Sequence, residues 1–285
     1  MDFRNAKELL KVCQEQDLSI SAVMLQRELT EGEQDPEETD RKMDRVLEIM
    51  KSAASTPIHT PVKSMGGLIG GEAKKISDHK DAGKGLCGNL LERAVIYAMA
   101  TLETNASMGV IVASPTAGSA GIVPGLLLAL QETYDLSDEQ IKQGLYNASA
   151  IGYLAMRNAT VAGAVGGCQA EVGIASAMAA SATVELMGGS PEQSLAAAST
   201  VLMNMLGLVC DPVEYPCQNR NAAGVANATI AAEIALSGVR QLIPFDEMLE
   251  AVYTVGKRLP AELRETALGG CATTPSACAA CHMCD

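Results

Sequence analysis

Three long runs of small side chains dominate the second half of the sequence, at residues 169–187, 194–208 and 222–237. These runs are too apolar to lie on a surface, so they predict helices at the centre of the fold. Small side chains let backbones approach closely, and this suits packed helices better than a β-sandwich, which needs β-branched and aromatic residues. The 285 residues include no Trp and only two Phe, which agrees with the helical interpretation.

Helical signals extend to the rest of the chain. Ser137 and Ser190 are each followed three residues later by Gln, which is the pattern of a capping box at a helix start. Residues 89–106 place apolar side chains at helical spacing. The only strand-like run is the short "GVIVA" at 109–113. The sequence therefore predicts an all-α fold, a compact multi-helix domain whose central helices are rich in small residues.

The composition changes near Thr56–Pro57 and again near the end of the chain. Residues 1–56 are charged and regular, and we expect an N-terminal helical segment that packs on the main domain. Residues 57–270 are expected to form the main helical domain, which carries the candidate cluster and catalytic residues. Residues 271–285 are expected to form an irregular, Cys-rich tail.

The charge pattern excludes several classes of partner. The formal net charge is −13, whereas a nucleic-acid binder shows a basic stripe, and an anionic membrane surface would repel the chain. The stretch "MDFRNAKELLKVC" lacks the apolar region of a signal peptide. Residues 104–131 carry no charge, but Pro115 and Pro124 interrupt them, so they do not predict a transmembrane helix. We expect a cytoplasmic protein with neither nucleic-acid nor membrane partners.

The nine cysteines are an odd number and are unevenly spread. In a cytosolic chain, metal binding or catalysis explains them better than disulfides do. Cys168 follows a Gly-Gly pair and precedes a helical run, where a thiolate is favoured by the helix dipole. Cys210 and Cys217 flank an acidic loop bounded by proline, and a polar cluster follows. An inert core position remains the alternative for each cysteine taken alone.

Three thiolates in one pocket would indicate a metal centre. A structural zinc site needs four N or S ligands and usually short Cys-x-x-Cys pairs. An iron–sulfur cluster accepts wider spacing, and with three protein ligands it leaves one iron open as a Lewis acid. We therefore expect the central helices to surround a metal-cluster pocket.

Two loops offer further polar groups. The stretch "SPTAGSAG" at 114–121 combines hydroxyls with free backbone and is a candidate seat for a carboxylate or phosphate, although an ordinary turn is the alternative. Its candidate residues are Ser114, Thr116, Gly118 and Ser119. In "GGEAKKISDHK", Lys75 and His79 are candidates for a cation or general base, and a solvated charged loop is the alternative.

The tail carries four of the cysteines: Cys271, Cys278, Cys281 and Cys284. The last three follow a Cys-x-x-Cys-x-x-Cys pattern, which is similar to part of the bacterial ferredoxin motif. Three interpretations stay open: a further ligand for the central cluster, a separate metal site, or a reactive tail.

Several ordered stretches together resemble one family, the α-subunit of iron–sulfur-dependent L-serine dehydratase. The resemblance covers about residues 5–270 and is carried by "LIGGEAKK", "ASMGVIVASPTAGSAGIVPG", "GGCQAEVGIASAMAA", "LGLVCDPV…PCQNRNA" and "LRETALGG". It implies an all-helical domain that holds a [4Fe–4S] cluster on three cysteines, which match Cys168, Cys210 and Cys217 here. It also implies L-serine as substrate, a separate β-subunit, and a role in amino acid catabolism and gluconeogenesis.

The implied reaction is a β-elimination that yields pyruvate and ammonia. We expect the 114–119 loop to hold the substrate carboxylate, and Asn219 and Arg220 to line the cluster pocket. Lys75, His79 or the β-subunit would supply the base.

Two features depart from the family pattern. Cys217 follows Cys210 by only seven positions, where the family has a longer segment, and the tail has extra cysteines. Three alternatives follow: a related lyase for another β-substituted amino acid, a non-catalytic iron–sulfur or metal-binding protein, or a structural subunit without activity.

Overall fold

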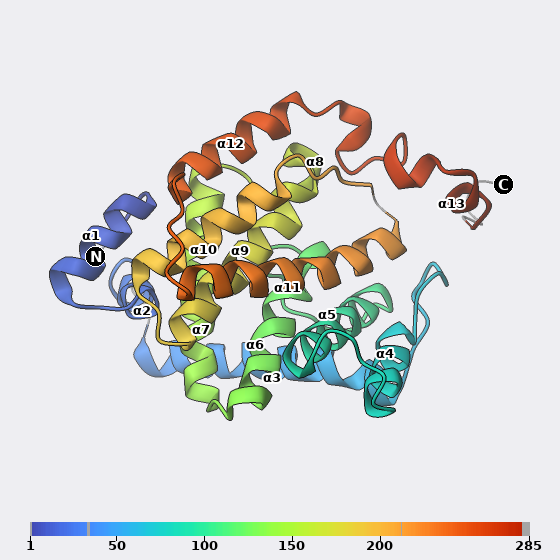
Figure 1. The fold of residues 1–285 in the computed structure, drawn as a ribbon, viewed down its shortest axis with the longest axis horizontal. Coiled ribbons are helices and arrows are strands. Elements are labelled where there is room, and N and C mark those ends of the chain that lie inside the picture. The colour runs from blue at the N-terminus through green and yellow to red at the C-terminus, as the bar shows by residue number, and fades with distance from the viewer. Residues whose placement is uncertain (1, 33–34, 212, 281–285) are drawn as a thin grey trace.

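The computed structural model describes residues 2–32, 35–211 and 213–280. This part of the chain is built from helices and connecting loops, which confirms the predicted all-α fold (Figure 1). The helices are α1 (Ala6–Gln16), α2 (Ile20–Thr30), α3 (Pro36–His59), α4 (Glu72–Asp81), α5 (Asn89–Ala106), α6 (Ile122–Tyr134), α7 (Asp138–Asn158), α8 (Gly163–Gly166), α9 (Cys168–Leu186), α10 (Pro191–Met205), α11 (Glu214–Leu236), α12 (Phe245–Arg258) and α13 (Pro275–Ala280), with 3₁₀ turns η1 (Ala117–Ser119), η2 (Ala261–Leu263) and η3 (Gly270–Thr273).

The predicted helix starts are present. The side chains of Ser137 and Ser190 each accept a hydrogen bond from the amide of the Gln three residues later. Each Gln side chain in turn accepts a hydrogen bond from the backbone amide of the same Ser. Asp35 caps α3 in a similar way by accepting from the amide of Glu38. These caps satisfy amides that would otherwise lack partners in the first turn of each helix.

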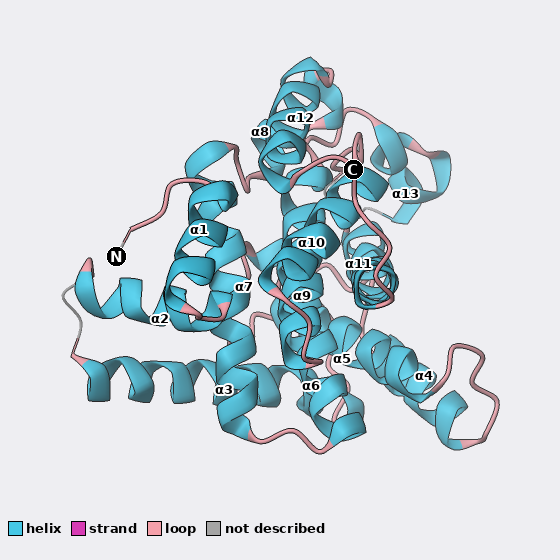
Figure 2. Cartoon of the chain, turned by 60° about the vertical axis from the view of Figure 1, so that its left-hand side comes forward, coloured by secondary structure: helices cyan, strands magenta, loops and turns pink. Residues whose placement is uncertain are grey.

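The three runs of small residues form α9, α10 and α11, as predicted. Helix α9 is buried almost along its whole length and packs against α6, α7, α10 and α11 (Figures 1 and 2). Glycine permits the closest approaches: a Cβ at Gly121 would collide with the carbonyl oxygen of Ala98 on α5. Close backbone packing around α9 holds the neighbouring loops in fixed positions.

The N-terminal segment shares the core of the main domain. Helix α2 packs on α7, α3 packs on α5, and the buried side chains of Phe3 and Leu9 belong to the same apolar cluster as α9. Helix α3 runs through Thr56 and Pro57 to His59, so the composition change falls inside a helix. The division at residue 56 stays a prediction.

The strand-like run at 109–113 lies in the non-helical connection between α5 and α6, and no described segment pairs with it. Across the described ranges, bridge pairing of strand type is limited to Cys210 with Arg264. None of the described helices is long and apolar enough to span a bilayer.

Candidate metal centre and substrate loop

Cys168 is the first residue of α9 and is almost completely buried. The preceding residue, Gly167, adopts a φ of 76°, which lets the chain turn sharply from α8 into α9. A Cβ at Gly167 would also lie 2.9 Å from the carbonyl oxygen of Leu208, so a larger residue would displace the next loop. The glycines that precede Cys168 therefore fix its sulfur at the start of the central helix.

Cys210 lies on the connection between α10 and α11 and is held by backbone on both sides. Its amide donates to the carbonyl oxygen of Leu263 at 2.9 Å, and its carbonyl oxygen accepts from the amide of Glu265 at 2.8 Å. The segment after α12 is thus a support for Cys210. This explains how a cysteine on a loop can be as buried as one on a central helix.

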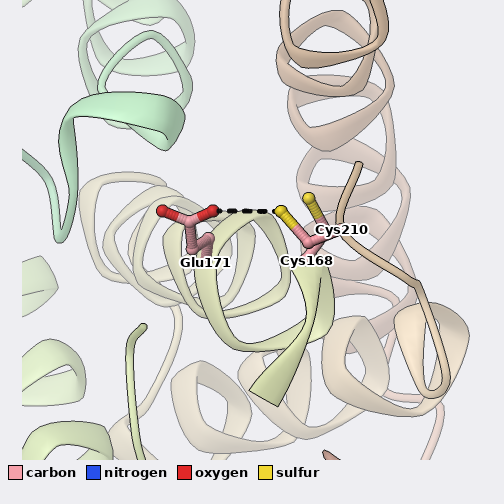
Figure 3. Close-up of side chains that lie close together, drawn as sticks. All are labelled: Cys168, Glu171 and Cys210. Carbon is pink, nitrogen blue, oxygen red and sulfur yellow. Dashed lines mark hydrogen bonds between the residues drawn. The ribbon is translucent and has the colours of Figure 1, made fainter. Parts of the chain in front are cut away.

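The fold brings Cys168 and Cys210 together with a carboxylate. The ligand atoms of Cys168, Glu171 and Cys210 all lie within 4.8 Å of one another (Figure 3). The Cys210 Sγ donates to Glu171 Oε2 at 3.8 Å. Two sulfurs and one oxygen at this spacing are a donor set that suits a metal ion.

The electrostatics of the two sulfurs differ. A hydrogen bond from Cys210, together with the Arg220 guanidinium, holds the pKa of Cys168 below its ordinary value although burial opposes the shift. The same hydrogen bond and burial raise the pKa of Cys210. Cys168 is therefore the more readily ionised of the two thiols, and the thiolate is the form in which cysteine binds metals.

Cys217 lies in the first turn of α11 and is partly buried. Burial, reinforced by the negative charge of the Cys168 thiolate, raises the pKa of Cys217 to about 12. Its thiol is therefore close enough to Cys168 to interact electrostatically, although it lies outside the close group of Cys168, Glu171 and Cys210.

Arg220 supplies the positive charge beside the sulfurs. Its Nη1 donates to the Cys168 Sγ at 3.4 Å and lies 2.5 Å from Asp211 Oδ1. Asp211 is buried, and its Oδ2 accepts from the amide of Cys271 at 2.5 Å. Burial acts to raise the pKa of Asp211, but the hydrogen bonds from Cys271 and the charge of Arg220 outweigh it and lower the pKa. Arg220 therefore lies beside the Cys168 sulfur.

The predicted substrate loop reaches the same carboxylate from its other side. Thr116 Oγ1 donates to Glu171 Oε1 at 2.6 Å, and the hydroxyls of Thr116 and Ser119 are 3.0 Å apart. A Cβ on Gly118 would lie 3.4 Å from Glu171 Oε1. Ser114 is buried, and its hydroxyl finds no hydrogen-bond partner among the described residues. The loop and the sulfurs therefore share one site, with Glu171 between them.

Sequence reasoning missed Glu171. Burial raises the pKa of its carboxyl, and the hydrogen bonds from Thr116 and Cys210 only partly offset that effect. One signal in the sequence could have identified it, because Glu171 is the only charged residue between Cys168 and Val184. A lone acid one turn after a candidate ligand needs a partner, since an unpaired buried charge is costly.

Sequence reasoning also missed Asn221 on α11, two residues after the predicted pocket residue Asn219. Asn219 is exposed, whereas Asn221 is completely buried and ties the substrate loop to α11. Asn221 Nδ2 donates to the carbonyl oxygens of Gly118 and Cys217, each at 2.8 Å, and Oδ1 accepts from the Gly121 amide at 3.1 Å. Two residues of helix correspond to 200° of rotation, so Asn219 points away from the face of Asn221.

Comparisons with known proteins agree with this geometry. The model of the family described as "Serine dehydratase alpha chain" matches residues 15–272. The chain belongs to this family. It is 48% identical over 278 residues to the probable L-serine dehydratase α chain of Bacillus subtilis, with 96% of this chain and 92% of the relative covered. It is 45% identical to the L-serine dehydratase α chain of Peptoniphilus asaccharolyticus, with 95% and 94% covered.

Relatives of a second kind are longer. The L-serine dehydratase TdcG of Escherichia coli is 33% identical over 283 residues, which cover 95% of this chain but only 62% of the relative. The resemblance predicted from the sequence is therefore confirmed, and the relatives named L-serine dehydratase are lyases. The name α chain implies a separate β chain.

The two candidate bases of this serine dehydratase α chain lie elsewhere. Lys75 and His79 are exposed on α4, and the Lys75 Nζ lies 3.6 Å from Glu72 Oε1. Figures 1 and 2 both place α4 well away from α8, the short helix that leads into Cys168. Within the described ranges, neither side chain contacts the sulfurs or Glu171. Their catalytic role stays a prediction.

The tail begins beside the site. The Cys271 amide donates a hydrogen bond to the Asp211 carboxylate, and Cys271 and Cys278 are exposed. The predictions for Cys281 and Cys284 fall outside the described residues.

Proposed function

We propose that this chain is the α-subunit of an iron–sulfur L-serine dehydratase, which converts L-serine to pyruvate and ammonia. One observation carries the proposal: two buried sulfurs and the 114–121 loop meet at the Glu171 carboxylate. The relatives supply the substrate, since their names state L-serine dehydratase. The proposed reaction belongs to amino acid catabolism in the cytoplasm, and its product pyruvate can enter gluconeogenesis.

The residues at the site fit an iron–sulfur cluster. Thiolate ligands select soft metals, zinc and iron–sulfur clusters over magnesium or calcium. Cys168 and Cys210 are buried side by side, Cys217 lies near them, and the Arg220 cation offsets thiolate charge. A cluster is larger than a single ion, so its three ligands need not converge on one point. We therefore assign Cys168, Cys210 and Cys217 as the ligands of a [4Fe–4S] cluster.

When bound, a cluster with three protein ligands would supply an open iron that acts as a Lewis acid on the departing hydroxyl. The chain itself binds and orients the substrate. Ser114, Thr116, Gly118 and Ser119 form the proposed seat of the substrate carboxylate, and Asn221 fixes this loop against α11. Arg220 lines the pocket beside Cys168. Asn219 would complete the pocket wall only if its exposed side chain turned inward.

The base that removes the Cα proton is the least defined part of the site. Lys75 and His79 on the charged helix α4 remain the candidates for this base, and the separate β chain is the other candidate source of it. Because both side chains are exposed on the α chain, the β chain would have to close over α4 to bring either of them into a site without water.

The test uses the α chain purified without oxygen together with its β chain. We expect pyruvate formation from L-serine, visible absorbance of a cluster, and about four irons per α chain. Cys210→Ser should abolish the absorbance. A coloured protein that turns over no β-substituted amino acid would support the metal-binding alternative, and turnover of another such amino acid but not serine would support the related lyase.

A further inference from the structure

The strand-like segment at 109–113 is left without a partner in this helical chain. Its sequence, Gly-Val-Ile-Val-Ala, has the β-branched composition typical of strands, and its backbone forms neither helix, turn nor bend. Val110 is 70% exposed, whereas Val112 is partly buried and packs on the main core. The segment is therefore anchored to the protein at Val112 and open to solvent at Val110.

The backbone of this segment also lacks hydrogen-bond partners in the described part of the chain. Among the described residues, the amides and carbonyls of residues 110–113 form no hydrogen bond. Both ends are nevertheless fixed, because Gly109 N donates to Thr104 O at 2.8 Å and Ser114 N donates to Thr116 O at 3.3 Å. A non-helical segment that is held at both ends and has free amides and carbonyls can pair with a strand from another chain.

Exposed apolar side chains surround this edge. Met108 is 78% exposed and Met65 is 77% exposed, and a hydrogen bond from Met65 N to Ala106 O at 2.8 Å holds their two loops together. Exposed groups of apolar residues mark interaction sites, and methionine adapts readily to a partner surface. Met108 also has a φ of 64°, an uncommon conformation for a residue other than glycine.

We propose that the β chain docks here, by adding a strand to residues 110–113 and covering the exposed Met65, Met108 and Val110. The choice of partner rests on the proposed function and on the relatives. This chain covers 92% and 94% of two relatives named α chain but 62% of the longer E. coli enzyme. Those two relatives are named α chain, a name that implies a separate β chain as partner.

Docking at this edge would act directly on the substrate loop. Residue 113 is followed at once by Ser114, and the loop continues to Thr116 and its hydrogen bond with Glu171. Pairing of residues 110–113 would hold the entrance of the loop from outside, while Asn221 holds its far end from inside. The proposed interface therefore couples β-chain binding to the geometry of the substrate seat.

Hydrogen exchange measured by mass spectrometry tests the proposal on the full α chain with the β chain from the same source. We expect the amides of residues 110–113 to exchange rapidly in the α chain alone and at least about tenfold more slowly in the complex. Unchanged exchange in a complex that co-migrates on gel filtration would overturn the proposal, as would failure to form a complex. Protection that grows with the concentration of the α chain alone would assign the edge to a second copy instead.

Matched variants add a second measurement. Val110→Lys should raise the Kd for the β chain at least about tenfold, whereas Val239→Lys, at a residue that is also more than half exposed, should leave it unchanged. Met108→Asn should also weaken binding, and it should fold because Asn tolerates positive φ. Equal Kd values for all three variants would refute the interface. A chain that binds the β chain but never holds iron would refute the cluster and leave the docking site supported.

Discussion

Replacement of Asn221 gives the sharpest test of how the substrate loop is held. The side chain is completely buried and forms three hydrogen bonds, two of them to Gly118 and Gly121 of the loop region and one to Cys217. A hydrogen bond contributes about 0.5–1.5 kcal/mol net, and a buried group left without its partner costs about 1–3 kcal/mol. We therefore expect Asn221→Ala to lower the free energy of unfolding by about 2–4 kcal/mol.

The chain provides its own control two residues earlier. Asn219 has the same side chain on the same helix but is exposed, so Asn219→Ala should change stability by less than about 0.5 kcal/mol. Urea unfolding of both variants, followed by circular dichroism on the metal-free chain, measures the difference directly. If the two variants unfold at the same urea concentration with the same slope, Asn221 does not hold the loop.

A second substitution at the same position separates two causes. Asn221→Asp keeps the shape and can still accept from the Gly121 amide, but the ionised side chain can no longer donate to Gly118 or Cys217. We expect the Asp variant to fold and to bind serine more weakly, with the KM raised more than kcat is lowered. An unchanged KM would mean that the loop position does not control substrate binding.

Two further predictions concern the surroundings of the site. The pKa of Asp211 is lowered in the folded chain, so its ionised form stabilises the fold above the ordinary aspartate pKa of about 3.9, and that stability is lost as the pH falls through the folded value. The stability difference between the natural chain and Asp211→Asn should therefore shrink below about pH 4 in urea titrations, and a constant difference would contradict this. Gly121→Ala should destabilise by about 1–3 kcal/mol because its Cβ meets Ala98 O. Gly173→Ala, whose Cβ would lie 3.8 Å from Met205 Cβ, should be neutral or stabilising by up to about 1 kcal/mol. Thermal melts of both glycine variants measure these changes, and a Gly173→Ala variant less stable than Gly121→Ala would refute the packing.

The helical architecture was predictable from the sequence because its signals are local. The capping boxes at Ser137 and Ser190 and the small-residue runs depend on neighbours a few positions away, and all of them match the structure. The run at 109–113 shows the limit of such signals. Its β-branched residues favour a strand and it stays outside the helices, but a strand also needs a partner, and none is present in the described part of the chain.

The site was predictable only in part because it depends on contacts between distant positions. The three cysteines and Arg220 were proposed through motifs, and the structure places Cys168 beside both Cys210 and Arg220. Glu171 was hidden in a run that reads as pure core, and the roles of Asn219 and Asn221 depend on a helix phase that composition does not reveal. Lys75 and His79 have suitable chemistry, but their positions on α4 could not be judged without the fold.

The backbone bridge between Cys210 and the segment that follows α12 also affects the order of assembly. Ribosomes make proteins from the N-terminal end, so both Cys168 and Cys210 emerge well before Leu263 and Glu265, which hold Cys210 in place. During synthesis, the nascent chain therefore carries thiols whose final spacing is not yet fixed. The support of Cys210 is therefore complete only after residue 265 has folded back onto the connection between α10 and α11.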